Sequence, residues 1–585
     1  MKSSTAFGCL FFCGTLGTAF SQTQISVTNT TVDAVLQGNY NPATFQAATV
    51  IDQIASIAPD MAARVSRDTL ESYLTKLTSF HNRNSASDTV SATQGIGAAR
   101  RWVYSKFQEF GVQSGGRLLP SYLQFTQTMC TTTRHRNVFA VLPGRDTTNH
   151  SLLIVAGHMD SRCEDNCNVT CKAHGADDDG SGAVVVMELA RVLSKYTFNH
   201  TLVFLVTTGE EQGKYGAIAF RDWCTSAKVP IQGVQNNDVV GGIICGPSSS
   251  PPSCSPSGAL DSTHVRVFST AINFSMNKAL GRFIKGQYDQ WIKPTAKMPM
   301  TITILDPTDR TGRGGDHMPF SEGGIPAIRF TESYENGDGS PTSGRQHNSN
   351  DIIGDDTNAD GKIDKFYVNF DYLARNVQIN AIGLIGGALG PQVPDFTLSE
   401  PLPQRYIRVT VTAPTSPVGS YKIAVRNSGN NDFAVAYTLK DSLNFTVPGT
   451  VAGRTYYIAM AAVDANGAQS LYSQEKSITA AVDGPTPIIR GKISGAAPRL
   501  MTPMVSIDRI SFRIQGLTTF MHSQFTLDIV NSRGKVLRSH RWVNGGGDQE
   551  ITLNRLGIPA SLYQILLKKQ GKVIDTQALL LTPTE

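Results

Sequence analysis

The chain carries little charge, and this shortage excludes several classes of protein. Asp, Glu, Lys and Arg make up 17% of its 585 residues, below the roughly 25% of typical soluble chains, which argues against a coiled coil or a highly charged tail. No dense block of Lys and Arg occurs and the formal net charge is only +5, so no binding to nucleic acid is expected. No apolar stretch reaches the ~18 residues that a membrane-spanning helix needs, so no transmembrane segment is predicted.

The first residues have the features of a secretory signal peptide. Lys2 precedes an apolar run from Phe7 to Phe20, and the small-residue pattern Ala19-Phe20-Ser21 stands before Gln22. We expect cleavage near Ser21 and a secreted protein, located outside the cell or at its surface. A buried first helix is the alternative, which the Gly and Thr content of the segment disfavours.

Cysteine is also scarce. The chain has nine cysteines, of which Cys9 and Cys13 would leave with the signal peptide. Seven would remain, and because seven is odd, at least one must be free or bonded to another molecule. The run Cys163, Cys167 and Cys171 is spaced as in some metal clusters but has no fourth soft ligand nearby. We therefore predict disulfides there.

The hydrophobic pattern predicts an α/β domain followed by two small all-β domains. Apolar residues make up 40% of the chain, and its length suggests three to four domains. Strand-like runs first alternate with helical patterns, which indicates a mostly parallel central sheet flanked by helices. Short strand-like runs separated by Gly, Asn and Pro then indicate a β-sandwich. The predicted units are the signal peptide (1–21), an N-terminal extension (22–66), the α/β domain (67–390), the sandwich (391–482), a linker (483–503) and a β-rich C-terminal domain (504–585).

Reactive side chains follow the predicted strands 152–156 and 202–207. His158 comes just after the first of these strands, and Glu210 and Glu211 come just after the second. Because ligands of an open parallel sheet bind outside the carboxyl ends of its strands, loops can bring further carboxylates and a second histidine to this edge. Singly, such residues are more often structural or solvated. Together, two imidazoles and several carboxylates suit zinc with an open catalytic position.

The order of these motifs resembles the co-catalytic zinc aminopeptidases of the bacterial leucyl aminopeptidase type, in metallopeptidase family 28. The match covers about residues 70–390 and runs GHMDS, GADDDGSG, TTGEEQG, NNDVVG, GGDHMPF with GIPAIRF, and QHNSND, with YLTKLTSFHNR and RNVFAVLPG upstream. The resemblance implies a secreted exopeptidase that removes N-terminal residues from peptides with free N-termini. It further implies a water molecule activated by two zinc ions and a Glu general base.

The resemblance assigns five metal ligands. Asp178 would bridge both zinc ions, His158 and Asp238 would complete one site, and Glu211 and His347 would complete the other. Three carboxylates and a bridging hydroxide would neutralise the charge of the two ions.

Two further roles follow from the same resemblance. Glu210, which is spared from coordination, would be the general base that takes the proton from the bridging water. Asp160, two residues beyond His158, would hold the other N–H of that imidazole.

His317, in the GGDHMPF motif, is an alternative to His347 as the histidine ligand of the second site. In the family, the histidine of the late His-x-x-x-Asp pattern is the ligand, so we choose His347. Some relatives carry a Tyr beside that histidine to stabilise the oxyanion. Gln346 stands there in this chain, so the resemblance names no oxyanion stabiliser other than zinc.

A separate loop follows part of a calcium-binding pattern. It has side-chain oxygens at positions 1, 3, 5 and 9 and Gly361 at position 6, but Tyr367 replaces the usual Glu at position 12. An acidic surface loop is the alternative. The candidate calcium ligands are Asp356, Asn358, Asp360 and Asp364.

The C-terminal regions resemble two further kinds of module. The stretch RTYYIAMAAVDANGAQSLYS (residues 454–473) is similar to a fibronectin type III domain. The last block, with FTLDIVNSRGKVLRS and LGIPASLYQILLKKQGKVIDTQALLL, resembles the C-terminal sorting domain of the type IX secretion route, which implies the secretion machinery as a partner. Both regions could equally be spacers.

Two other functions compete with the peptidase. A glutaminyl cyclase of the same fold uses a single zinc, so a metal content near two per chain would favour the peptidase. A catalytically inactive binding or receptor module would be expected to lose ligands or the base, and none is missing here. The sequence leaves open the preferred N-terminal residue and the choice between aminopeptidase, dipeptidase and carboxypeptidase.

Overall fold

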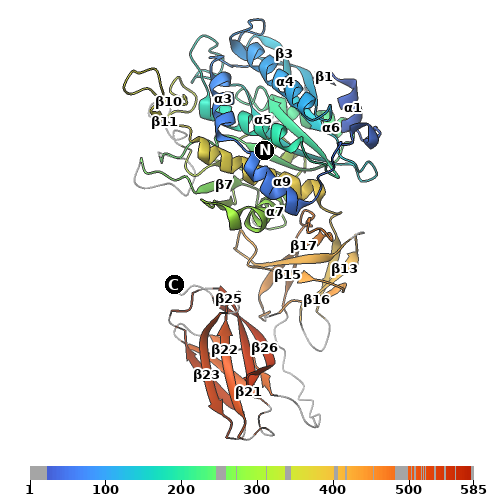
Figure 1. The fold of residues 1–585 in the computed structure, drawn as a ribbon, viewed down its shortest axis with the longest axis vertical. Helices are drawn as coiled ribbons and strands as arrows, with labels where there is room; N and C mark the ends of the chain where they lie inside the picture. The colour runs from blue at the N-terminus through green and yellow to red at the C-terminus, as the bar shows by residue number, and fades with distance from the viewer. Residues whose placement is uncertain are drawn as a thin grey trace, which may run out of the picture.

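The computed structural model describes residues 23–245, 258–335, 344–400, 406–480 and 498–581, with short gaps at 272, 311, 416–417, 449, 452 and several positions after 501. The predicted signal peptide and most of the predicted linker lie outside the described residues. Figure 1 shows an α/β body followed by two β-rich units along the long axis. Among the described helices, none is both long and apolar enough to cross a lipid bilayer.

A nine-stranded mixed sheet forms the centre of the α/β body. Its order is β1-β2-β3-β5-β4-β6-β9-β7-β8. The middle strands β5, β4, β6 and β9 are parallel, whereas β1, β2, β3 and β5 pair antiparallel with one another and β7 pairs antiparallel with β9. The strands are β1 (Thr23–Val27), β2 (Leu119–Met129), β3 (Thr132–Leu142), β4 (Leu152–His158), β5 (Thr201–Thr207), β6 (Ile231–Asn237), β7 (His264–Phe268), β8 (Thr301–Leu305) and β9 (Ala327–Glu332).

This arrangement confirms the predicted α/β class but shows a mixed sheet: parallel pairing holds for the central strands and for β7 with β8 at one edge, and the other neighbouring strands pair antiparallel. Only Cys130 and Thr131 separate β2 from β3, and so short a connection permits only antiparallel pairing. The first strand, β1, also belongs to this sheet. Part of the predicted N-terminal extension is thus built into the α/β body.

Helices cover both faces of the sheet, which explains why β4 and β5 are buried along their whole length. Along β4, Leu153 and Val155 belong to the hydrophobic core shared with α2–α5, α7 and α9, and the alternate residues belong to the core shared with α1, α6 and α8. The helices are α1 (Thr30–Leu36), α2 (Ile54–Arg64), α3 (Arg67–Thr78), α4 (Gly95–Gln113), α5 (Gly182–Leu193), α6 (Tyr215–Ser226), α7 (Met276–Trp291), α8 (His317–Glu322) and α9 (Phe370–Leu389).

The first β-rich unit consists of two small sheets that enclose one core. One sheet has the order β12-β13-β16 and the other β15-β14-β17-β18, and all their pairs are antiparallel. The strands are β12 (Asp395–Ser399), β13 (Arg408–Ala413), β14 (Ser420–Asn427), β15 (Val435–Leu439), β16 (Asn444–Thr446), β17 (Thr455–Val463) and β18 (Lys476–Thr479). The identification with a fibronectin type III domain stays a prediction.

The second β-rich unit also has two antiparallel sheets around its own core. One sheet contains β19 (Arg499–Leu500), β20 (Met504–Val505), β21 (Arg509–Gln515) and β24 (Gln549–Asn554). The other has the order β23-β22-β25-β26, formed by β22 (Gln524–Val530), β23 (Val536–Val543), β25 (Ser561–Lys569) and β26 (Lys572–Leu581). Two small all-β units therefore follow the α/β body, as predicted.

The first β-rich unit packs directly against α7, as Figure 1 shows. Leu471 and Tyr472 of this unit belong to the hydrophobic core of the α/β body. Beside them, the Glu475 carboxylate lies 2.6 Å from Arg282 of α7 and 2.6 Å from Arg426 of β14, and these three side chains are at most 1% exposed. A buried three-residue ion cluster thus joins the two units.

Replacing Glu475 with Gln should destabilise the protein by about 3–5 kcal/mol, because two buried guanidinium groups would lose their shared counter-charge. Equilibrium unfolding in urea measures this change. The neighbouring Lys476–Asp395 pair is largely exposed, so the control Lys476→Gln should cost only about 0–1 kcal/mol. Equal stabilities of the two variants would contradict a stabilising interface.

Candidate functional site

The carboxyl ends of three parallel strands meet at one edge of the sheet, and the predicted site residues gather there. β4 ends with His158, β5 ends three residues before Glu210, and β6 ends just before Asp238. Asp178 comes from the turn Ala176–Ser181 that precedes α5. His347 comes from the loop after β9 and reaches the same place, with its Nε2 atom 3.0 Å from Asp178.

The Asp178 carboxylate lies between the two histidines. Its Oδ1 atom is 3.4 Å from His158 Nε2, and its Oδ2 atom is 3.0 Å from His347 Nε2. Burial alone would raise the pKa of Asp178, but the hydrogen bonds from both imidazoles hold it well below its usual range. Each oxygen therefore faces a different histidine, as a carboxylate shared between two metal sites requires.

The next residue, Asp179, has a different role that the sequence analysis missed. Its Oδ2 atom accepts a hydrogen bond from the backbone N–H of His158 at 2.9 Å, and its Oδ1 atom accepts one from Gly182 at 2.9 Å. Asp179 thus ties the end of β4 to the start of α5. The resemblance singled out Asp178 among the three consecutive acidic residues but gave Asp179 no role.

Glu210 and Glu211 point into the same space from one turn. Glu211 Oε2 is 3.3 Å from His347 Nε2, and Glu210 Oε2 is 4.0 Å from His158 Nε2. Burial and the neighbouring carboxylates raise the pKa of Glu210 well above its usual range, although His158 opposes this effect. For Glu211, burial is outweighed chiefly by His347, and the pKa is lowered.

Asp160 holds the backbone of this turn. Its carboxylate accepts hydrogen bonds from the backbone N–H groups of Glu210 and Glu211 at 3.4 and 3.2 Å. His158 Nδ1 lies 3.0 Å from the backbone carbonyl of Asp160 and 3.6 Å from its carboxylate. The predicted contact to the imidazole is thus made more closely by the main chain than by the side chain.

A buried ion-pair network supports Asp238. Arg329, from β9, lies 3.0 Å from the Asp238 carboxylate and 3.0 Å from Asp309, and it also reaches Glu335. All four side chains are buried. Arg329 belongs to the GIPAIRF motif and had no predicted role, although a charged residue inside a buried strand is itself an unusual signal.

Asp351 holds the segment that carries Asp178. Its two carboxylate oxygens accept hydrogen bonds from the backbone N–H groups of Asp177 at 2.8 Å and Asp178 at 2.9 Å. Burial and the nearby Asp177 raise the pKa of Asp351 to about 8. This residue is the aspartate of the QHNSND motif, to which the sequence analysis gave no role of its own.

His317 does not join the cluster. Its Nε2 atom lies 2.8 Å from the backbone carbonyl of Thr308 and its imidazole is buried, and burial lowers its pKa to about 4. Gln346, next to His347, accepts a hydrogen bond from Arg313 at 3.2 Å.

The predicted calcium loop uses its oxygens for its own backbone. It lies between β10 (Gly354–Asp355) and β11 (Lys365–Phe366). The Asp356 carboxylate accepts hydrogen bonds from the N–H groups of Asp360 and Gly361, and Asp364 accepts from Thr357. Among the described residues, the groups that could hold a metal do not include this loop. The structure therefore gives the calcium prediction no support.

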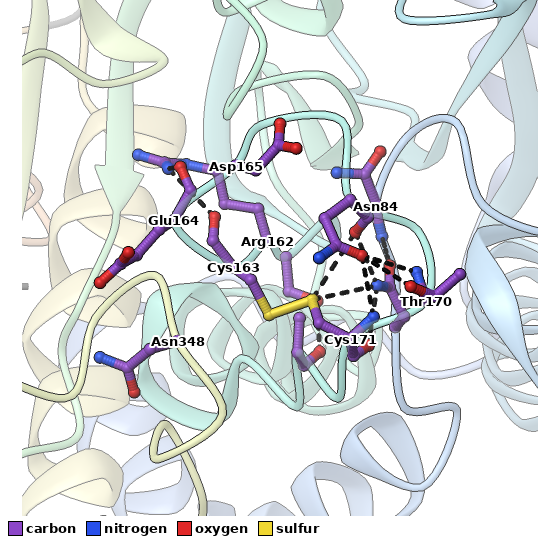
Figure 2. Close-up of a disulfide and its surroundings, with 12 residues drawn as sticks. Asn84, Arg162, Cys163, Glu164, Asp165, Thr170, Cys171 and Asn348 are labelled. Carbon is purple, nitrogen blue, oxygen red and sulfur yellow. Dashed lines mark hydrogen bonds between the residues drawn. A yellow bond between two sulfur atoms is a disulfide. The ribbon is translucent and has the colours of Figure 1, made fainter.

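Disulfides hold a loop beside the cluster, as predicted from the cysteine spacing. Cys163 pairs with Cys171 and Cys130 with Cys167, and Cys245 is also disulfide-bonded. Cys224 is free and buried, which satisfies the odd count. Figure 2 shows the Cys163–Cys171 bond next to the backbone of Arg162. The Arg162 guanidinium lies 2.7 Å from Glu211 and 2.7 Å from His347 Nδ1.

Two groups of side chains could each hold a metal ion. They are His158, Asp179 and Asp238, and Asp178, Glu211 and His347, and within each group the ligand atoms lie within 4.8 Å of one another. Asp178 is also within 3.4 Å of His158, whereas the Asp179 oxygens already accept backbone hydrogen bonds. Glu211 Oε1 is buried without a hydrogen-bond partner in the described part of the chain. These nitrogen and oxygen donors fit zinc.

Replacing Asp351 with Ala should weaken metal binding about 10–100-fold, a typical loss when a group that orients a ligand is removed. The backbone N–H groups of Asp177 and Asp178 would lose their acceptor, so the Asp178 carboxylate would be less well placed. Titration with zinc under a competing chelator measures the affinity, and Asp351→Asn keeps the volume if the Ala variant unfolds. Asp364→Ala, in the exposed loop, should bind as the unaltered protein does. Equal affinities for all the proteins would refute this role of Asp351.

Comparison with known proteins finds a matching peptidase family and relatives described as probable zinc metalloproteases. The sequence profile of Peptidase family M28 matches residues 137–366. A probable zinc metalloprotease of Leptosphaeria maculans is 30% identical over 387 residues, which cover 63% of this chain and 85% of the relative. A second relative, from Pyrenophora teres f. teres and also described as a probable zinc metalloprotease, is 29% identical over 389 residues, which cover 63% of this chain and 76% of that relative.

Among solved structures, the LapA aminopeptidase of Legionella pneumophila is 19% identical with a TM-score of 0.41, covering 58% of this chain and 76% of that chain. This likeness carries no information about the substrate. The family follows instead from the profile and from the extent of the match to the relative from Leptosphaeria maculans. By its sequence, this chain belongs to peptidase family M28.

Proposed function

We propose that the protein is a secreted zinc exopeptidase that removes N-terminal residues from peptides with free N-termini. The observation that carries the proposal is the position of Asp178, whose two oxygens face His158 and His347. Asp238 lies on the His158 side and Glu211 on the His347 side. Two relatives described as probable zinc metalloproteases support zinc as the metal.

In this proposal Asp178 would contribute to both zinc sites, His158 and Asp238 would complete one site, and Glu211 and His347 would complete the other. Zinc held there would polarise the peptide carbonyl and make a water molecule acidic enough to attack it. Asp160 and Asp351 orient the segments that carry these ligands. Arg329 keeps the Asp238 carboxylate in place.

Glu210 is the proposed general base. Its carboxylate takes a proton from the attacking water while the new C–O bond forms. It later delivers the same proton to the nitrogen of the leaving amine while the C–N bond breaks. Glu210 lies near His158 but outside both candidate ligand groups.

Hydrolysis of aminoacyl-arylamides by the purified protein tests the proposal. We expect release of the arylamine that stops with a chelator and returns when zinc is added. The N-acetylated form of the same substrate is the control and should not be cleaved. Cleavage that is insensitive to the chelator, or equal cleavage of the blocked substrate, would contradict a metal-dependent aminopeptidase.

The last β-rich unit is proposed to direct export through secretion machinery. If so, truncation after Pro503 should leave an active enzyme inside the cell envelope, because the α/β body has a core of its own. Activity in the culture medium and in cell fractions measures the distribution. Normal export of the truncated protein would refute this role.

A further inference from the structure

The pocket that contains the candidate metal ligands is lined mostly by residues with ionisable side chains. Beside Asp178, Glu210, Glu211, Asp238 and His347, the described residues that line it are four cationic side chains and three glycines, with no apolar side chain among them. A pocket for a leucine-like side chain would instead be lined by hydrophobic and aromatic groups. The four cationic residues are Arg162, Lys214, Arg310 and Arg313.

Two of these cations already form ion pairs within the protein. Arg162 lies 2.7 Å from the Glu211 carboxylate. Arg310 lies 3.1 Å from Asp309 and also contacts Glu335. Both guanidinium groups are therefore already held by carboxylates of the protein before a substrate enters.

Lys214 and Arg313 are different, because neither forms an ion pair with a carboxylate of the described chain. Arg313 donates a hydrogen bond to the neutral amide of Gln346 at 3.2 Å, which fixes its guanidinium at the pocket that His347 also lines. The Lys214 ammonium lies against Gly314, where an added methyl group would meet it at 3.1 Å. Gly314 therefore leaves room for Lys214 at the pocket wall.

The carboxylates of the pocket have other tasks. Asp178, Glu211 and Asp238 are the proposed metal ligands, and Glu210 is the proposed base. Beyond the free α-ammonium of the proposed substrate, a further cationic group would find no uncommitted carboxylate among the lining residues, whereas an anionic group would find Lys214 and Arg313. Hydrogen bonds between charged partners are about twice as strong as neutral ones.

We propose that Lys214 and Arg313 bind a carboxylate of the substrate next to the scissile bond. The inference rests on the proposed exopeptidase function and names its substrate class. The carboxylate has two possible sources, the side chain of an acidic N-terminal residue or the free C-terminus of a dipeptide. In both cases the preferred substrates carry a negative charge within reach of this pocket.

Two matched substrate pairs test the proposal and separate the sources. Glu- and Gln-p-nitroanilide differ only in the side-chain carboxylate, and Ala-Ala and Ala-Ala-amide differ only in the C-terminal one. We expect kcat/KM to favour the charged member of one pair by about 10–100-fold, as one or two hydrogen bonds to charged groups provide. A ratio near one in both pairs would overturn the proposal.

Variants assign the effect to the two side chains. In Lys214→Met and Arg313→Met the favoured ratio should fall towards one. Lys228→Met is the control, because Lys228 lies just beyond the other end of α6, is exposed, and shares the left-handed backbone of Lys214. An unchanged ratio in both pocket variants would refute the assignment.

Binding of free amino acids gives a readout that does not depend on turnover. Calorimetry should show tighter binding of glutamate than of glutamine if the side-chain carboxylate is recognised, and tighter binding of alanine than of alaninamide if the C-terminal carboxylate is. The substitutions Lys214→Met and Arg313→Met should each weaken the binding of the favoured ligand. If no unblocked substrate is cleaved, the proposed function fails, and calorimetry still decides the chemistry of the pocket. Equal binding within both pairs would contradict it.

Discussion

Replacing Glu210 with Gln should lower kcat about 10²–10⁴-fold, the usual loss when a general base is removed. The amide keeps the size and the hydrogen-bonding capacity of the side chain but cannot accept the proton of the attacking water. KM should change much less than kcat if the base acts chiefly in the transition state. Steady-state kinetics of the purified variant give both numbers.

The adjacent residue provides the control. Glu211 is 3.3 Å from His347 and belongs to a candidate ligand group, whereas Glu210 does not. Glu210→Gln should therefore keep its zinc, and Glu211→Gln should lose part of it. Near-normal turnover in Glu210→Gln would show that the base is another residue.

Replacing Asp178 with Ala should remove most zinc from the protein, since Asp178 alone is proposed to contribute to both sites. His158→Ala and Asp238→Ala should each empty one site and leave about half of the metal. Elemental analysis of the purified variants measures the ratio of zinc to protein. An unchanged ratio in Asp178→Ala would exclude the shared ligand.

A substitution of Asp179 also tests whether Asp178 is the metal ligand. It groups geometrically with His158 and Asp238, but its oxygens accept hydrogen bonds from His158 and Gly182. Asp179→Asn should therefore retain more zinc than Asp178→Ala. The reverse order would make Asp179 the ligand and Asp178 the residue that holds the backbone.

The gathering of the site residues could be predicted because strands of a parallel sheet end at a common edge. The end of β4 and the turn after β5 carry His158, Glu210 and Glu211, and the burial of both strands follows from their continuous apolar runs. The resemblance to a known family then added Asp178, Asp238 and His347, which arrive on loops. The structure brings all six together.

The supporting contacts could not be predicted from the sequence. Asp351 meets the backbone of Asp177 and Asp178 across 174 and 173 residues of chain, and Arg329 meets Asp238 across 91 residues. Such contacts depend on the conformations of the loops between strands, which hydrophobic periodicity does not predict. The cationic pocket wall has the same origin, since Lys214 and Arg313 come from separate loops.

The zinc content of the unaltered protein tests the central claim most directly. Metal analysis of the purified, fully loaded protein should give about two zinc ions per chain, because the two oxygens of Asp178 face the histidines of the two proposed sites. A glutaminyl cyclase of this fold would hold one. A ratio near one, or a protein that binds no zinc, would contradict the account of a two-zinc exopeptidase.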